Sequence, residues 1–181
     1  SDGFTDLSIM RRDLVDMKLY SVKDVQEVVD TNEKQRYTLL TDEQGNVWIR
    51  ANQGHSGKVK DSIDDNLLLE EITDHEKIPI CVHGTNNKSY SIIKDQGLSR
   101  RERHAIHFAS GKANDDSVTS GMRASAKVLI YINVEKAMAD GIKFFISTNG
   151  VILSPGNTLL QDSDGFSGVI NPTYFSKVEF L

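Results

Sequence analysis

The sequence predicts an α+β protein, because three local patterns indicate few helices and many short strands. A capping-box pattern at 21–24 precedes apolar residues at helical spacing. Two apolar runs flank a turn-like segment at 42–45, and Asn149-Gly150 separates two further apolar runs, which is typical of hairpins. The 181 residues suit one domain or two small ones. We expect two lobes, 1–75 and 76–181.

The first lobe is predicted to hold a helix followed by a hairpin. Ser21-Val-Lys-Asp24 begins the helix, whose valines fall on one face. Tyr37–Leu40 and Asn46–Arg50 then flank Asp42-Glu-Gln-Gly45, which suits a four-residue turn. A helix followed by a hairpin is the second half of a winged helix, a shape that often holds nucleic acid. We therefore expect a partial winged-helix lobe.

The second lobe is predicted to be rich in strands. A strand is expected over 79–82, followed by His83-Gly-Thr85, and a helix over 89–96 that Gly97 ends in a left-handed cap. Further along we expect a central strand at 128–132, a type I′ hairpin turn at Asn149-Gly150, a long loop over 156–168 and a final strand at 175–180.

Composition narrows the functional class. Cys81 is the only cysteine, which excludes a disulfide framework, a thiolate zinc site and a redox pair. No apolar run approaches the ~18 residues of a membrane span, and we expect an intracellular, cytoplasmic or nuclear monomer without a membrane partner. The net charge of −5 argues against nucleic acid, but residues 76–127 carry nine basic and five acidic side chains. Basic charge is concentrated in the middle of the chain.

The segment Arg50-Ala-Asn-Gln-Gly-His-Ser56 groups hydrogen-bond donors after a predicted strand. A guanidinium can bind two phosphate oxygens at once, and Gly54 lets the backbone approach closely. Arg50, Gln53 and His55 are therefore candidate phosphate ligands. An ordinary polar loop after an edge strand is the alternative interpretation.

His83-Gly-Thr85 lies between a predicted strand and helix, where a glycine admits a ligand and His and Thr offer hydrogen bonds. A turn with a capping threonine would look the same. His107 alternates with apolar neighbours as a strand residue does, which also suits a structural histidine. Four potentially cationic side chains within 99–104 suit either an anion site or a solvated loop.

Ser120-Gly-Met-Arg123 supplies a second isolated arginine, which could instead reach solvent from a helix end. Two distant arginines with histidines between them, and no carboxylate-rich or cysteine-rich cluster, describe an anion site without a metal. The chain lacks the phosphate-loop, dinucleotide, serine-hydrolase and zinc-protease motifs. Phosphate binding by arginine, which stabilises charge in a displacement reaction, is the chemistry that remains.

Six motifs in order resemble the NAD-dependent RNA 2′-phosphotransferase family. They are Ile49–Ser56, Val82-His-Gly-Thr85, Gly97-Leu98, Ile106-His107, Ser120-Gly-Met-Arg123 and Asn149-Gly-Val-Ile-Leu153. The resemblance also takes in 24–36 and runs over nearly the whole chain. It implies an RNA-binding winged-helix lobe and an ADP-ribosyltransferase-like lobe that binds NAD.

The resemblance implies a reaction and its residues. A 2′-phosphate of spliced tRNA is transferred to NAD, giving 2′-hydroxyl RNA, nicotinamide and ADP-ribose 1″,2″-cyclic phosphate, with no metal. Arg50 and Arg123 match two catalytic phosphate-binding arginines of the family. The NAD contacts fall on His83, Gly84, Thr85, His107, Ser120, Gly121 and Val151. Val151 stands where protein-modifying relatives carry a glutamate, which would repel an incoming phosphate.

The chain departs from the family pattern at two places. Ala105 replaces the first histidine of a His-x-His pair, with His104 displaced by one residue. The family's first Arg-His pair lies in an N-terminal helix, and this chain starts at Ser1, in a stretch resembling the segment just after that helix. We therefore expect an N-terminally shortened chain with an impaired second step. Two other functions stay open: ADP-ribosylation of nucleic-acid terminal phosphates, or an inactive RNA- or ADP-ribose-binding module.

Overall fold

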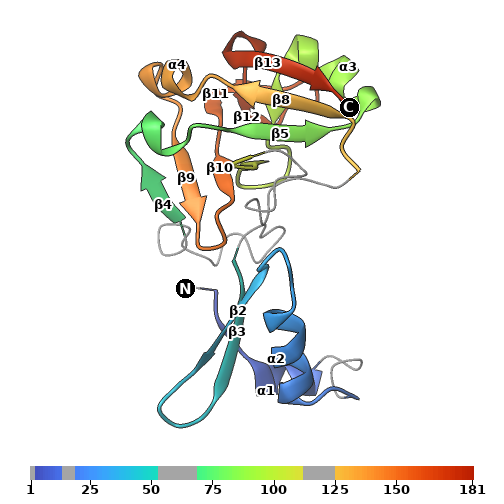
Figure 1. The fold of residues 1–181 in the computed structure, drawn as a ribbon, viewed down its shortest axis with the longest axis vertical. Helices are drawn as coiled ribbons and strands as arrows, with labels where there is room; N and C mark the ends of the chain where they lie inside the picture. The colour runs from blue at the N-terminus through green and yellow to red at the C-terminus, as the bar shows by residue number, and fades with distance from the viewer. Residues whose placement is uncertain (1–2, 14–18, 53–68, 112–124) are drawn as a thin grey trace. The chain divides into compact units, whose positions relative to one another are not determined.

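The structure is a computed structural model that describes residues 3–13, 19–52, 69–111 and 125–181. The chain divides into two compact units, Ser1–Leu68 and Leu69–Leu181, and each is described by itself (Figure 1). The described residues contain four α-helices and several antiparallel strand pairs. This architecture agrees with the α+β prediction. No helix in these ranges combines the length and apolar character that a membrane crossing needs.

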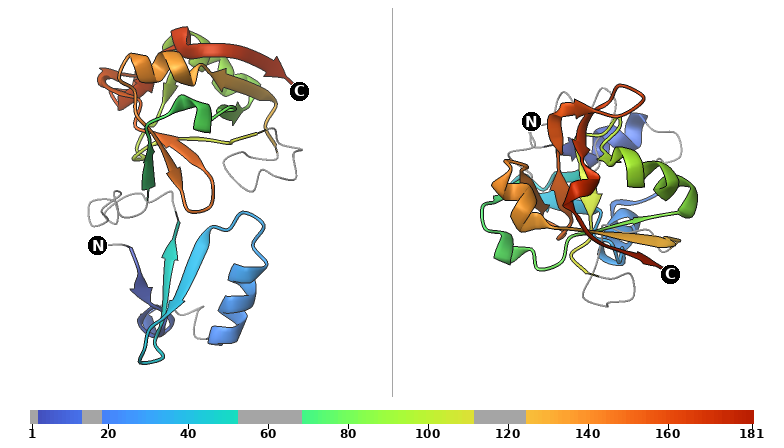
Figure 2. Two further views of the ribbon diagram at one scale, coloured as in Figure 1. Left: turned by 60° about the vertical axis from the view of Figure 1, so that its left-hand side comes forward. Right: turned by 90° about the horizontal axis from the view of Figure 1, so that it is seen from above.

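The first unit packs two helices on one face of a small sheet, as the left view of Figure 2 shows for α2. Leu7, Val25 and Val29 are buried there against Val47 and Ile49 of the sheet. The strand order is β1-β3-β2. The elements are β1 (Thr5–Asp6), α1 (Leu7–Asp13), α2 (Val22–Asp30), β2 (Tyr37–Thr41) and β3 (Val47–Ala51).

Local side-chain hydrogen bonds fix the start of α2 and the turn of the β2–β3 hairpin. Ser21 accepts from the Asp24 amide and the Asp24 carboxylate accepts from the Ser21 amide, so the capping box is confirmed. The Asp42 carboxylate accepts from the amides of Gln44 and Asn46, and Gly45 has a φ of 84°. The predicted hairpin is confirmed, whereas β1 and α1 have no counterpart among the predicted elements.

The described residues of the second unit form three antiparallel sheets, with the strand orders β4-β9-β10-β7, β11-β12-β6 and β13-β8-β5. Its strands are β4 (Leu69–Ile72), β5 (Val82–Thr85), β6 (Leu98–Ser99), β7 (Ile106–Phe108), β8 (Val128–Ile132), β9 (Phe144–Ser147), β10 (Ile152–Ser154), β11 (Asn157–Gln161), β12 (Ser167–Ile170) and β13 (Phe175–Phe180). The α-helices are α3 (Asn87–Gln96) and α4 (Val134–Ala139), and 3-10 turns span His75–Lys77 and Pro172–Tyr174.

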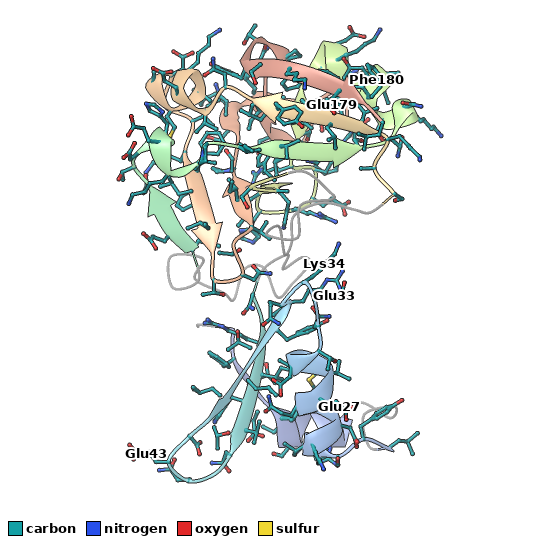
Figure 3. All side chains as sticks on the ribbon, in the orientation of Figure 1. Glu27, Glu33, Lys34, Glu43, Glu179 and Phe180 are labelled. Atoms are coloured by element: carbon teal, nitrogen blue, oxygen red, sulfur yellow. The ribbon has the colours of Figure 1, made fainter. Side chains whose placement is uncertain are left out.

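The largest core of this unit lies between its sheets. Phe108 and Phe144 are fully buried, with ring centroids 6.2 Å apart. The predicted central strand is confirmed, since β8 lies between β13 and β5. Figure 3 labels Glu179 and Phe180 at the end of β13, where the Phe180 ring packs edge-on against Tyr90 of α3.

The prediction for β5 was wrong in its bounds. The strand begins at Val82, so His83, Gly84 and Thr85 belong to it rather than following it. The cause is pairing, because these residues face Ile130, Leu129 and Val128 of β8. The predicted helix is confirmed as α3. Gly97 ends it with the positive φ that a left-handed cap requires, 90°, although its ψ of 177° lies outside the left-handed helical region.

Two further predictions need correction. The β9–β10 hairpin is confirmed, but Gly150 has a positive φ and Asn149 does not, which excludes a type I′ turn. The expected loop over 156–168 instead contains β11, a turn and the first half of β12. Asp162 organises that turn by accepting from the amides of Asp164 and Phe166. The final strand at 175–180 is confirmed.

Candidate functional site

A cleft of about 550 Å³ opens in the second unit. It is lined by the end of β5, by α3, and by the segment that runs from Gly97 to His107. Of the predicted site residues, the structure brings His83, Gly84, Thr85 and His107 to this one cleft. Residues far apart in sequence are therefore collected around a space large enough for a small molecule.

His83 is held at one wall by a hydrogen bond from its ring. Its Nδ1 lies 2.9 Å from the carbonyl oxygen of His107, so Nδ1 carries the proton and donates. The ring also packs edge-on against the buried Phe108, with centroids 6.0 Å apart. When the ring is neutral, this arrangement makes Nε2 the acceptor.

His107 occupies the middle of β7, opposite Leu153 of β10. Burial, helped by the charge of Arg103, lowers the pKa of His107 to about 4 against the opposing hydrogen bond to Ala105. The imidazole is therefore neutral at pH 7. Its Nδ1 lies 3.1 Å from the Ala105 carbonyl oxygen and donates to it, which leaves Nε2 as an acceptor.

The start of α3 adds uncharged polar groups to the cleft. The Asn86 side chain caps the helix by accepting from the Ser89 amide, and both residues line the cleft. Gly84 lines it without a side chain, while the amide of Lys127 donates to the Thr85 carbonyl. Hydroxyl and amide groups at this end suit ribose and phosphate oxygens.

The arginines of 99–104 divide into three roles. Arg100 is structural, because its guanidinium donates to the Ser167 carbonyl, the Ser167 hydroxyl and the His104 carbonyl. Arg101 pairs with Asp164 and lies 3.2 Å from Asp162. Arg103 lines the cleft, and its guanidinium has no acidic partner in the described part of the chain. It is the cation left to bind an anion there.

Asp162 is the acidic residue of the cleft wall, and its side chain is only 2% exposed. Burial raises the pKa of its carboxyl, but hydrogen bonds from Ser99, Phe166 and Asp164 and the charge of Arg101 outweigh burial and lower it. The carboxylate is thus ionised and engaged in holding the β11–β12 turn against the arginine segment. Sequence reasoning missed it, because its signal is an ordinary turn composition.

Arg50 belongs to the first unit, on β3, where it faces Thr38 of β2. Its Cζ lies 4.6 Å from the centroid of the Phe4 ring. Two residues further, the buried Asn52 accepts from the Thr38 hydroxyl and donates to the Gln35 carbonyl, which fixes the end of the strand.

The remaining predicted residues divide between two cases. Val151 is described, is fully buried, and packs with Ala105 and Leu153 rather than lining the cleft. The others lie outside the described residues: Gln53, His55, Ser120, Gly121 and Arg123. Among the described residues, no group of three or more His, Cys, Asp and Glu side chains is placed to hold a metal ion.

Comparison with known proteins gives a consistent result. A family model described as "RNA 2′-phosphotransferase, Tpt1 / KptA family" matches residues 1–156. The chain is 45% identical to tRNA 2′-phosphotransferase 1 of Danio rerio over 165 residues, covering 90% of this chain and 68% of that protein. It is 43% identical to the Homo sapiens protein of the same name, covering 98% and 65%. The Saccharomyces cerevisiae tRNA 2′-phosphotransferase is 33% identical, covering 85% and 68%. The chain thus spans about two-thirds of the length of these relatives.

Proposed function

Because the chain belongs to the RNA 2′-phosphotransferase family, we propose that it transfers the 2′-phosphate of spliced tRNA to NAD. The products are 2′-hydroxyl RNA, nicotinamide and ADP-ribose 1″,2″-cyclic phosphate. One observation carries the proposal: the cleft gathers two histidines, each with Nδ1 donating to a backbone carbonyl, beside Arg103, which has no acidic partner among the described residues. An intracellular location, cytoplasmic or nuclear, is the one that suits a tRNA substrate.

The residues of the cleft fit NAD as a co-substrate. His107 offers an Nε2 acceptor for a ribose hydroxyl, His83 lines the same cleft, and Arg103 offers a cation for the diphosphate. NAD, when bound, supplies a ribose carbon from which nicotinamide departs. The chain's own part is to bind and orient it, and Ile106, buried beside His107, limits water on that wall.

Arg50 is the described residue that we assign to the RNA phosphate. A guanidinium can bind two phosphate oxygens and neutralise charge as the phosphate reacts. For Gln53, His55 and Arg123 on the phosphate, and for Ser120, Gly121 and Val151 on NAD, the assignment rests on the motif resemblance alone. We keep the winged-helix and ADP-ribosyltransferase-like identities of the two units as part of the proposal, supported by the helix–hairpin order and by the cleft.

The decisive experiment uses a synthetic RNA with one internal 2′-phosphate, incubated with NAD and the chain. Nicotinamide, ADP-ribose cyclic phosphate and 2′-hydroxyl RNA are followed separately by mass spectrometry. We expect all three to appear, with the cyclic phosphate and the 2′-hydroxyl RNA in equal amounts because the same step releases both. The matched control RNA carries a 2′-hydroxyl at the same position. Intact ADP-ribose binding with no nicotinamide release above this control would overturn the proposal, and a stable ADP-ribosyl group on a 5′-phosphorylated RNA would indicate terminal-phosphate chemistry instead.

A further inference from the structure

Phe4 and Arg50 meet on neighbouring strands of the first unit. β1 pairs with β3 so that Thr5 faces Ile49 and Asp6 faces Trp48, and the same register brings Phe4 opposite Arg50. The Cζ atom of Arg50 lies 4.6 Å over the Phe4 ring, well within cation–π range.

Arg50 carries a charge that no acidic side chain neutralises in the described part of the chain. Its Nε is buried and has no hydrogen-bond acceptor among the described residues. In the second unit, by contrast, Arg101 forms ion pairs with Asp162 and Asp164. Arg50 is therefore restrained mainly by a ring rather than by a carboxylate.

The difference matters for an anion site. A carboxylate that held Arg50 would occupy its N–H donors and cancel its charge, so a phosphate would have to compete with it. An aromatic ring attracts the cation through its quadrupole and offers no lone pair to the N–H groups. The terminal N–H donors and the charge then remain for a ligand, while the side chain has already lost much of its rotamer freedom.

The backbone holds Phe4 firmly enough to act in this way. Leu7, three residues on, is 1% exposed and anchors the segment in the core of the unit. The Asp6 carboxylate accepts from the amide and the hydroxyl of Ser8, which fixes the change from strand to helix. Phe4 is thus tied to the sheet on one side and to α1 on the other.

We propose that Phe4 is a positioning residue that holds Arg50 ready for the RNA 2′-phosphate. The inference rests on the proposed function, since it assigns Arg50 to that phosphate. It adds the residue that fixes the arginine and the type of interaction that fixes it.

A double-mutant cycle tests the proposal with the whole chain. The quantity measured is the ratio of affinities for an RNA with one internal 2′-phosphate and for the same RNA with a 2′-hydroxyl. Phe4→Leu, which keeps apolar volume, should lower this ratio about fivefold, and Phe4→Trp should restore it. In an Arg50→Met background, Phe4→Leu should have no further effect, because it acts through Arg50.

Tyr37→Leu is the matched control, since it removes an exposed aromatic ring from the same sheet, opposite Ala51. It should leave the ratio unchanged.

Thermal melting of each variant checks folding. In Phe4→Leu, the Arg50 Nε–H proton resonance should lose its ring-current shift. A wild-type ratio near one overturns the assignment of Arg50 and this inference with it. Wild-type discrimination that Phe4→Leu leaves intact, or lowers equally in both backgrounds, overturns this inference alone.

Discussion

The Nδ1 atom of His83 lies 2.9 Å from the carbonyl oxygen of His107, so one cleft histidine is oriented by the backbone of the other. The two residues are on β5 and β7, which are also joined by the paired backbone hydrogen bonds of Val82 and Ala109. A shift of either strand would therefore move both rings. Because the two histidines are coupled in this way, their contributions to stability and to ligand binding can be separated only by substitutions that change one ring nitrogen at a time.

Replacing His83 by Asn or by Gln should separate the contributions of its two ring nitrogens to stability and to NAD binding. Asn can place an amide near Nδ1 and keep the hydrogen bond to His107, so we expect wild-type stability and about tenfold weaker NAD binding. Gln reaches the position of Nε2 and loses the inner hydrogen bond, so the free energy of unfolding should fall by about 1–3 kcal/mol. Denaturant unfolding and NAD titration measure the two effects. Equal losses of stability in both variants would contradict the assigned tautomer.

The stability of the protein should depend on pH through His107. Burial, the main cause, holds the folded pKa near 4, below the ordinary 6.5, so the unfolded chain binds the proton more tightly. The contribution is therefore present above pH 6.5 and is lost as pH falls from 6.5 towards 4, by up to about 3 kcal/mol. The check is the free energy of unfolding across this range for wild type and His107→Asn.

In that comparison His107→Asn keeps a donor near Nδ1 for the Ala105 carbonyl but has no proton to gain. Carboxylates that titrate at lower pH remain in both proteins, so they cancel in the difference. Parallel pH curves for the two proteins would show that His107 titrates normally in the folded state.

Elements with local signals could be predicted from the sequence, and elements specified by distant partners could not. The α2 capping box and the Asp42 turn depend on residues within four positions, and both are predicted correctly. The β11–β12 hairpin has the composition of a loop, because Ser, Asp and Gly are equally common in loops and in the turn that Asp162 organises.

The candidate site shows the same division. His83, Gly84, Thr85 and His107 line one cleft, but local sequence patterns did not group them, and only the family resemblance implied a shared NAD site. The roles of the arginines could not be predicted, because Arg100 and Arg101 are engaged by Ser167 and Asp162, more than sixty residues away. Only the fold shows that Arg103, among the described arginines of the cleft, is the one without such a partner.

Gly168 should not tolerate alanine, because its surroundings leave no space for a side chain. Its φ is 86°, and an added Cβ would lie 2.3 Å from the Pro155 carbonyl oxygen and 2.5 Å from Arg100 Nε. We expect Gly168→Ala to lower the free energy of unfolding by about 3 kcal/mol or more. Gly165→Ala is the matched control: its φ is 83° but nothing lies within 4 Å, so about 1 kcal/mol is expected. Equal melting temperatures of the two variants would contradict the packing of Arg100.

Arg103 should contribute to NAD binding with little effect on stability. Arg103 lines the cleft without an acidic partner among the described residues, so Arg103→Ala removes no ion pair from the part of the protein that the structure describes. We expect ADP-ribose affinity to fall about tenfold and to become less sensitive to salt, since a charge-assisted contact with the diphosphate is lost. Calorimetric titration at two salt concentrations measures both effects.

Lys143→Ala is the matched control for Arg103→Ala, because it removes one positive charge from the same unit outside the cleft wall, at an exposed pair with Glu71. It should leave ADP-ribose affinity unchanged, and by breaking an exposed pair it should cost at most about 1 kcal/mol of stability. A similar loss of affinity in both variants would mean that Arg103 acts only through the overall charge of the unit. Because salt screens the contact that Lys143→Ala retains and Arg103→Ala lacks, the difference in affinity between the two variants should narrow at high salt.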